Sequence, residues 1–578
     1  MRYLAAALIR HRHHCYLHSR SQPLADFGCW DDAQVTLYLR VRDHTEGNEH
    51  CFRRLTAIIL CKQFYTRICC NSFVELYVGM DVLAIDELLR HIFQYCDRRD
   101  NLNNALVSKK WSEEALSALW KHLDAMYPLL SLLAPLVKSK DNSSLREFER
   151  PLWSYDWTIF RKYSWRVYTI VYSSIGSELY SHSVFTEIAL SKPQGDLIPN
   201  LRNLACTPYS LCDFIPLLLN RRLVDLTIGG TTGKSLPKVK SLLSYLPDRS
   251  PMLSRLKLQI FDYEYTEIGL DVFLSPLSRL NELEIGPATL TPCVIRALAC
   301  LPSLEHIRST HQWDTRTPNR LPHPPVDTSE RFTSLRLLEI STDNVPLFLE
   351  PYKLNALRKL VLQPHTQQTR EQHLRFFEVI SACCPQLEIL QLEKWRNGSE
   401  RPSKLAPAAW ETFAPLRHLT RLTELCLIDL PMTTPGLLYL AENLPSLKHL
   451  DLRRSTTTDG TPAFPISVLP QLAVIRPQLT FLCLCLDTSL SALAMTFDNA
   501  RFRCLAELNV GPSCLDSSPL EVATYLRGIL PEECRLTRLW DGWSGAGEER
   551  WNSWEPVIEM LPALLLNQGT SQETNPAL

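Results

Sequence analysis

The sequence has almost no net charge and no long apolar run. Among its 578 residues, 61 Lys and Arg stand against 62 Asp and Glu, which leaves a formal net charge of −1. Without a field of one sign to attract phosphate backbones or anionic lipid, we expect neither a nucleic-acid partner nor a membrane partner. No apolar run approaches the ~18 residues of a membrane-spanning helix. The apolar segment at the N-terminus is short and lacks a small-residue cleavage site, so it is a poor secretory signal.

Cysteines are too few for a disulfide scaffold at this length, and their number, 19, is odd. Cys426, Cys483 and Cys485 lie inside apolar runs, where a free cysteine behaves as a small buried hydrophobe. A reducing compartment, the cytoplasm or the nucleus, fits this usage best. Residues 1–80 contain patches of Cys and His, but no pair-of-pairs spacing suits a tetrahedral zinc ion. We therefore expect no metal site, and we interpret residues 1–80 as a disordered or poorly packed extension.

Motifs for catalysis are absent or incomplete. The sequence has no His-Glu-x-x-His, and the nearest nucleophile elbow, Gly542-Trp-Ser-Gly-Ala, ends in Ala546 where the motif needs glycine. Gly229-Gly-Thr-Thr-Gly-Lys-Ser approximates a phosphate-binding loop, but Ile228 stands where its first glycine belongs and would crowd the phosphate cradle. We interpret this segment as a strand-to-helix turn, with an enzyme that uses the loop as an alternative. We therefore expect no cofactor and no enzymatic activity.

What the sequence does contain, within residues 83–123, is a set of three short amphipathic helices. Asp100 is a candidate N-cap for the second helix, and the third begins at Ser108. About 40 residues are too few to enclose so much apolar surface, so the pattern predicts an adaptor module that completes its core against another protein. The apolar residues at helical spacing are Leu88, Leu89, Ile92, Phe93 and Cys96, then Leu102, Ala105 and Leu106, then Trp111, Ala115, Leu116, Leu119 and Trp120.

At these residues the chain resembles an F-box in its fungal form, in which Ile85-Asp-Glu-Leu-Leu precedes Ile-Phe, Asn-Ala-Leu-Val, Lys-Lys-Trp-Ser and Ala-Leu-Trp. The resemblance implies docking onto the Skp adaptor of cullin-based ubiquitin ligases. Two positions depart from the family pattern, because Ile85 replaces the usual proline and Ser108 the usual cysteine. The alternative is an ordinary helical hairpin buried within a larger domain. Carried over position by position, the adaptor-binding residues would be Leu83, Ile85, Leu88, Leu89, Ile92, Phe93, Leu102, Val107, Trp111, Leu119 and Trp120.

From about residue 200 the chain repeats the unit Leu-x-x-Leu-x-Leu. The average interval is about 28 residues, which matches leucine-rich repeats with one strand and one helix apiece. Alternation points the two leucines of Leu-x-Leu into the interior and the residue between them outward, and stacked repeats share one core. Prolines before the next strand, Pro247, Pro302, Pro385 and Pro445, are expected to end the helices. Clear copies begin at Leu223, Leu253, Leu280, Leu335, Leu357, Leu387, Leu422, Leu447, Leu479 and Leu505, and weaker ones at Leu201, Leu304 and Leu536.

The remaining segments complete the predicted organisation. The aromatic-rich stretch 153–168 is interpreted as a wedge between the helical module and the repeats, with a ligand-stacking surface as the alternative. Tryptophans of 540–554 would close the far end, and two proline-containing inserts, 311–330 and 395–409, would project as loops. The predicted divisions are an extension at 1–80, an F-box at 81–124, a connector and cap at 125–199, a solenoid at 200–545, and a C-terminal cap with a disordered tail at 546–578.

These patterns predict an α/β fold, a solenoid of about 12 irregular leucine-rich repeats preceded by a three-helix F-box. The leading hypothesis is a substrate-recognition subunit of a ubiquitin ligase, with a Skp-type adaptor, a cullin and an unknown target protein as partners. The alternative is a leucine-rich scaffold unrelated to ubiquitin, whose F-box helices merely cap the array. Alternation alone selects candidate target contacts on the outward face of the strands, namely Asp225, Lys257, Glu284, Glu339, Gln391 and Asp451.

Overall fold

The structure is a computed structural model in which the chain forms two compact units, Met1–His122 and Leu123–Leu578. A two-residue strand, β1 (His122–Leu123), spans the division between them. The described residues are 85–172, 179–206, 214–231, 236–260, 269–286, 289–309, 332–341, 345–363, 369–392, 409–428, 430–453, 464–489, 500–511, 513, 515–538 and 553–566.

The described residues of the first unit form three helices, α4 (Asp86–Tyr95), α5 (Arg98–Asn104) and α6 (Lys109–Lys121), and α6 packs against both of the others. The Ser108 side chain accepts a hydrogen bond from the Trp111 N–H at 3.2 Å and caps α6, which begins one residue after the predicted start at Ser108. The cap of α5 is Asp97, whose carboxylate accepts from the Asp100 N–H at 2.8 Å. The prediction that Asp100 is the cap was therefore wrong by three residues.

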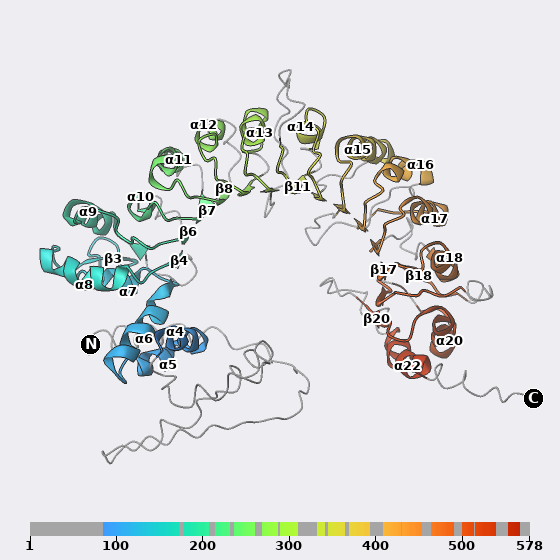
Figure 1. Cartoon of the computed structure of the whole chain (residues 1–578), viewed down its shortest axis with the longest axis horizontal. Helices are drawn as coiled ribbons and strands as arrows, with labels where there is room; N and C mark the ends of the chain where they lie inside the picture. Colours follow the sequence, from blue (N-terminus) through green and yellow to red (C-terminus); the bar gives the residue numbers. More distant parts are fainter. Residues whose placement is uncertain are drawn as a thin grey trace, which may run out of the picture. The chain divides into compact units, whose positions relative to one another are not determined.

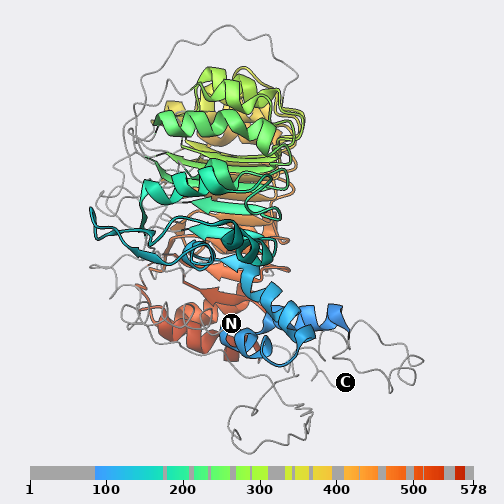
Figure 2. The same cartoon turned by 90° about the vertical axis from the view of Figure 1, so that its left-hand side faces the viewer.

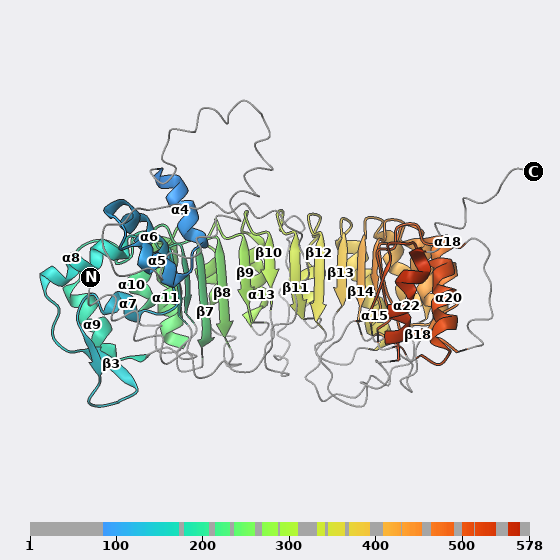
Figure 3. The ribbon, with the colours of Figure 1, turned by 90° about the horizontal axis from the view of Figure 1, so that it is seen from below.

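The second unit is built on one long parallel sheet, in which each strand pairs with the strand of the next repeat (Figures 1 and 3). The ladder begins upstream of residue 200, because β4 pairs with β6. Its strands are β4 (Thr169–Tyr172), β6 (Asn203–Cys206), β7 (Asp225–Thr231), β8 (Arg255–Ile260), β9 (Glu282–Ile285), β10 (His306–Arg308), β11 (Leu337–Ser341), β12 (Lys359–Gln363), β13 (Ile389–Leu392), β14 (Glu424–Leu427), β15 (His449–Asp451), β17 (Phe481–Cys483), β19 (Glu507–Asn509) and β20 (Arg535–Thr537).

The leucine pattern explains this register. The fourth position of successive copies forms one buried row, as in the pairing of Leu338 with Leu360 and of Leu450 with Leu482. The first leucine of each copy is buried as well, so both positions feed one continuous core. One copy was framed wrongly, because Leu536 pairs with Leu508 and so occupies the fourth position of its copy instead of the first.

Helices lie on the outer side of the sheet and the strands line its inner side (Figures 1 and 2). Proline at the first turn and a threonine cap start several helices, since proline needs no N–H donor there. The described part of this unit contains α7 (Tyr127–Leu130), α8 (Ser154–Ser164), α9 (His182–Ser191), α10 (Ile215–Leu218), α11 (Leu236–Arg249), α12 (Leu270–Leu274), α13 (Pro292–Ala299), α14 (Val345–Leu349), α15 (Arg370–Cys383), α16 (Trp410–Phe413), a 3₁₀ helix η6 (Ala414–His418), α17 (Thr434–Asn443), α18 (Val468–Ile475), α20 (Pro519–Ile529) and α22 (Glu555–Leu566).

Prolines end helices at three of the four predicted places. Pro302, Pro385 and Pro445 each lie just beyond a helix, after α13, α15 and α17. Pro247 instead lies inside α11, which continues through Arg249. A proline blocks one backbone hydrogen bond of the preceding turn, and near the end of a helix that loss is small enough for the turn to close.

Two small sheets accompany the ladder. Near its start, β2 (Leu136–Lys138) pairs with β3 (Leu145–Phe148), and β3 pairs with β5 (Leu179–Tyr180). Near its end, β16 (Phe464–Pro465) pairs with β18 (Leu486–Asp487).

The two ends of the second unit are closed by aromatic side chains. In α8, Trp157, Phe160 and Tyr163 are buried, and the Trp153 N–H donates to Asp156 at 2.8 Å to start the helix. At the other end α22 packs on α20, and the buried Trp554 indole donates to the Ser513 carbonyl at 3.2 Å. No helix within the described ranges is both long enough and apolar enough to cross a membrane.

Several predictions fall on residues outside the described ranges. These are the extension 1–80, Leu83, the insert 311–330, and the insert 395–409 apart from Ala409. Residues 232–235 of the Gly229–Ser235 segment also lie outside the description, as do Trp540, Trp543, Trp551 and the segment 567–578. Ile228, by contrast, is buried in β7, as its place in a repeat strand requires.

Candidate functional site

The helices of the first unit fold around a small apolar core. Leu89 and Phe93 of α4 are buried, and the Phe93 ring meets that of Trp111 edge to face, with centroids 5.4 Å apart. Edge-to-face contact aligns the positive ring edge with the negative ring face of its partner and fixes α4 on α6. Trp120, near the end of α6, is also buried.

A buried asparagine closes the corner between α4 and α5. The Asn101 amide donates to the carbonyl oxygens of Phe93 and Cys96, at 2.8 and 3.2 Å. These carbonyls belong to the last turn of α4, which has no intrahelical donors left for them. The amide therefore supplies a C-terminal cap from another helix. Hydrophobic periodicity could not identify this residue, because the partner carbonyls belong to the backbone.

Ion pairs link α4 to α6 on the surface of the unit. Arg90 donates through Nε and Nη2 to the two carboxylate oxygens of Glu114, at 2.9 and 3.1 Å, and this contact raises the pKa of Arg90. Lys110 pairs with Asp86 at 3.0 Å. A bidentate arginine–carboxylate pair has fixed geometry, so Arg90 and Glu114 hold the two helices in register.

Large apolar side chains remain exposed at the turn between α5 and α6. Leu106 is 74% exposed, Tyr95 at the end of α4 is 66% exposed and Val107 is 55% exposed. We call these three residues the apolar turn. Val107 is among the predicted docking residues, whereas Leu106 and Tyr95 are not. The sequence did contain a signal that Leu106 lies outside a helix. Asn103 and Asn104 are weak helix formers, and α5 ends at Asn104.

Ten of the eleven predicted adaptor-binding residues are described, and they occupy three environments. Leu83 lies outside the described residues, and Leu89, Phe93 and Trp120 belong to the internal core. Val107 is exposed with the apolar turn. The half-buried members are Ile85, Leu88, Ile92, Leu102, Trp111 and Leu119. Their role in adaptor binding stays a prediction.

The inner side of the long sheet presents two rows of outward-facing side chains. The first row contains the residue before each buried leucine, such as Asp225, and the second contains the residue after it. Five of the six candidate target contacts lie in the second row. Four of them are half-buried, whereas Asp451 is only 2% exposed.

Between β7 and β11 these rows carry charges that neutralise one another. Arg255 pairs with Asp225 at 3.0 Å, and Lys257 pairs with Glu284 at 2.5 Å. Arg308 lies 2.8 Å from Glu282 and 3.9 Å from Glu339. Each pair joins neighbouring strands. Burial nevertheless raises the pKa of Asp225, because desolvation outweighs the attraction of the Arg255 guanidinium.

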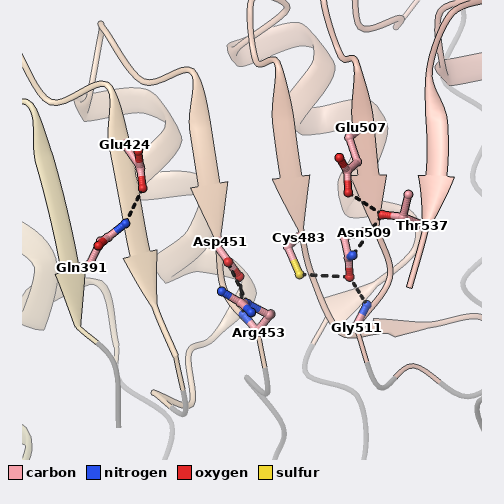
Figure 4. A network of polar contacts seen from close by, with 9 residues as sticks. All are labelled: Gln391, Glu424, Asp451, Arg453, Cys483, Glu507, Asn509, Gly511 and Thr537. Atoms are coloured by element: carbon pink, nitrogen blue, oxygen red, sulfur yellow. Dashed lines mark hydrogen bonds and ion pairs between the residues drawn. The ribbon is translucent and has the colours of Figure 1, made fainter. Parts of the chain in front are cut away.

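Between β13 and β20 a different polar network crosses the second row (Figure 4). The Asn509 side chain accepts from the Cys483 thiol at 3.4 Å and from the Gly511 N–H at 2.9 Å, and donates to Thr537 Oγ1 at 3.0 Å. Thr537 in turn donates to Glu507 at 2.6 Å. Burial raises the pKa of Cys483 well above its usual value, so the thiol stays protonated and donates.

Asp451 is buried because a residue of its own strand end folds over it. The Arg453 Nε and backbone N–H both donate to its carboxylate, at 2.8 and 3.1 Å (Figure 4). The carboxylate is thereby neutralised within the chain. Cys426 and Cys483, in the same row, are buried as predicted. No group of three or more His, Cys, Asp or Glu side chains in the described part of the chain is placed to hold a metal ion.

Residues 86–126 match the F-box-like family model. Among solved structures, the TLR13–ssRNA13 complex is 14% identical, with a TM-score of 0.34; the match covers 68% of this chain and 57% of that one. An internalin from Listeria monocytogenes is 14% identical, with a TM-score of 0.28, over 58% of this chain and 79% of that one. No curated protein matches the sequence. The predicted fold class is confirmed: a helical F-box-like module precedes a leucine-rich-repeat solenoid.

Proposed function

We propose that this chain is the substrate-recognition subunit of a Skp–cullin–F-box ubiquitin ligase. The observation that carries the proposal is the F-box-like match at 86–126 together with the exposed apolar turn in the same helices. Three large apolar side chains on so small a unit favour a protein partner, because exposed apolar surface is stabilised by burial. The F-box would bind a Skp-type adaptor and, through it, a cullin.

The apolar turn and the half-buried members of the predicted set are the contacts we assign to the adaptor. Leu89, Phe93 and Trp120 would act indirectly, because their side chains hold the helices in place. Ser108 takes a structural role of its own as the N-cap of α6.

The repeats would hold the target protein. F-box and leucine-rich-repeat modules are binding modules, so catalysis would take place in partner subunits and this chain would supply proximity and orientation. We place its action in the cytoplasm or the nucleus, where cysteines stay reduced. The described cysteines are free thiols, in keeping with that assignment.

Capture of a purified Skp adaptor by the full chain tests the proposal. We expect the wild type to bind, and the double variant Leu106→Asp with Val107→Asp to lose roughly 2–4 kcal/mol of binding free energy, since charges would enter the centre of the interface. Both residues are exposed, so the module should still fold. Leu190→Asp is the matched control, because Leu190 in α9 is 80% exposed and lies in the other unit.

Two outcomes would contradict the proposal. One is the absence of adaptor capture by the wild type, which would leave a leucine-rich scaffold without a ubiquitin role. The other is equal capture by the double variant and the Leu190→Asp control, which would separate the apolar turn from binding. Adaptor binding that falls only in the double variant supports the assignment.

A further inference from the structure

The inner face of the sheet carries two carboxylates without ion partners. Glu424 of β14 accepts a hydrogen bond from the Gln391 amide at 2.6 Å, and Glu507 of β19 accepts from Thr537 at 2.6 Å. Neither forms an ion pair among the described residues. Both differ in this from the carboxylates between β7 and β11, each of which has a cationic neighbour.

An aromatic pair lies between these two carboxylates in the same row. The register places Glu424 beside His449, His449 beside Phe481, and Phe481 beside Glu507. The two rings are stacked, with centroids 4.0 Å apart and planes 5° apart. Because the rings stack along the row, the outer face of Phe481 is turned towards the strand of Glu507, and that of His449 towards the strand of Glu424.

No ion pair within the described chain neutralises Glu424 or Glu507. In the neighbouring second row, the Asp451 carboxylate is already neutralised by Arg453. Arg535 lies opposite Glu507 on β20 but forms no ion pair with it in the described structure. All four members of the row are half-buried, so the carboxylates are partly desolvated yet reachable. Such carboxylates attract a cation more strongly than fully hydrated ones do.

We propose that the row Glu424–His449–Phe481–Glu507 docks an arginine-bearing extended segment of the target protein. This inference rests on the proposed function, because it assigns a chemistry to the target that the repeats hold. A guanidinium can stack on an aromatic face while it donates two hydrogen bonds to a carboxylate, which a lysine ammonium cannot do. The row offers that combination at both ends.

The distance between Glu424 and Glu507 predicts the spacing of two arginines in the ligand. Glu424 and Glu507 are separated by three strand intervals, about 14 Å at the usual spacing of ~4.8 Å. An extended peptide advances about 3.3 Å per residue and repeats its face every second residue, so side chains four residues apart match this distance. The favoured ligand therefore has arginines at positions i and i+4.

The test uses the full chain and a fluorescein-labelled Gly/Ser decapeptide with arginine at positions 3 and 7, measured by fluorescence anisotropy. We expect this peptide to bind, the lysine version to bind several-fold more weakly, and the glutamate version not to bind. Binding should weaken as salt is raised, since the contact is electrostatic. Equal binding of the arginine and glutamate peptides, or no binding of either, overturns the proposal.

Variants localise the contact. Glu424→Gln and Glu507→Gln keep the shape and the neutral hydrogen bonds, and each should weaken binding about tenfold through loss of a charge-assisted contact. Phe481→Leu should weaken it several-fold. Glu284→Gln is the matched control, because the same charge is removed from an ion-paired carboxylate of the same face.

Wild-type affinity in both Glu→Gln variants, or an equal loss in Glu284→Gln, overturns the assignment. Adaptor capture is measured in parallel on every variant and should not change. If the wild type binds the peptide but not the adaptor, the ubiquitin-ligase role fails and the arginine site stands. If it binds the adaptor but not the peptide, the reverse holds.

Discussion

At the scale of single residues, the repeats contain a histidine that is buried as a neutral ring. His373 of α15 is buried beside Phe377, and its Nδ1 lies 3.0 Å from the Thr369 carbonyl oxygen. That contact requires the Nδ1–H form, so a second proton would have to be placed on Nε2. Burial lowers the pKa of His373 below its ordinary value of 6.5.

This shift predicts a loss of stability in mild acid. In the unfolded chain His373 takes up a proton as the pH falls through 6.5, whereas the folded chain resists it, so stability is complete above 6.5 and falls towards the lower folded pKa. The free energy of unfolding by urea should be lower at pH 5.5 than at pH 7.5, and this difference should be smaller in His373→Gln.

The exposed His182 of α9 gives the control for this effect. His182→Gln is the variant with which the pH dependence of His373→Gln is compared. If His373→Gln and His182→Gln retain the same dependence, the buried ring is not its source.

Alternation in the sequence placed outward-facing residues on the correct side of the sheet but could not predict their partners. Glu284 pairs with Lys257 of the preceding strand, and Arg308 reaches carboxylates on both neighbours. Such pairs depend on the register between strands that are far apart in the sequence. Asp451 illustrates the limit, because its direction was predicted while its burial under Arg453 was not.

At the scale of elements, the F-box-like helices show how local chemistry sets a helix start. Only two residues, Cys96 and Asp97, separate α4 from α5, and Asp97 has the extended backbone of a cap, with φ −68° and ψ 171°. Asp100 lies at the third position of the helix, where its N–H receives the cap. Aspartate is a preferred N-cap residue, so both Asp97 and Asp100 were candidates from the sequence. The length of the connection between α4 and α5 decides which of them caps the helix.

Substitution distinguishes these two aspartates. Asp97→Ala should destabilise the first unit by about 1 kcal/mol, because an N–H of the first turn loses its acceptor. Asp100→Ala should cost only about 0.3 kcal/mol, the value of a negative charge near the helix dipole. Hydrogen exchange of amides 98–104 in the full chain measures both. Equal effects would mean that Asp97 does not act as the cap.

The strands of the repeats could be predicted from the sequence wherever the spacing of the leucines alone determines which residues are buried. The fourth positions of successive copies lie in one row because each buries its side chain against the next repeat. The start of the last copy was predicted three residues too late. Its first position holds Glu533 instead of leucine, so Leu536, which occupies the fourth position, was taken for the first. Pro247 lies inside α11, so the rule that proline ends a helix applies less strictly in the last turn.

At the scale of the whole molecule, the chain divides into two units with different requirements. In the solenoid each repeat contacts mainly its neighbours, so stacking of repeats stabilises the unit. A terminal repeat has a neighbour on one side only, and its apolar core must be covered by a cap. The buried Trp554 and the packing of α22 on α20 close one such end.

Truncation tests this division and separates the two main hypotheses for the chain. A chain that begins at Leu123 should keep the urea midpoint of the repeats, retain arginine-peptide binding and lose adaptor capture. A chain that ends at Ile529 should unfold at lower urea, because it loses β20 and α22 and exposes the core of the last repeats. If instead the N-terminal truncation unfolds the repeats as severely, the F-box-like helices serve as their cap, and a scaffold role explains the module without a ligase.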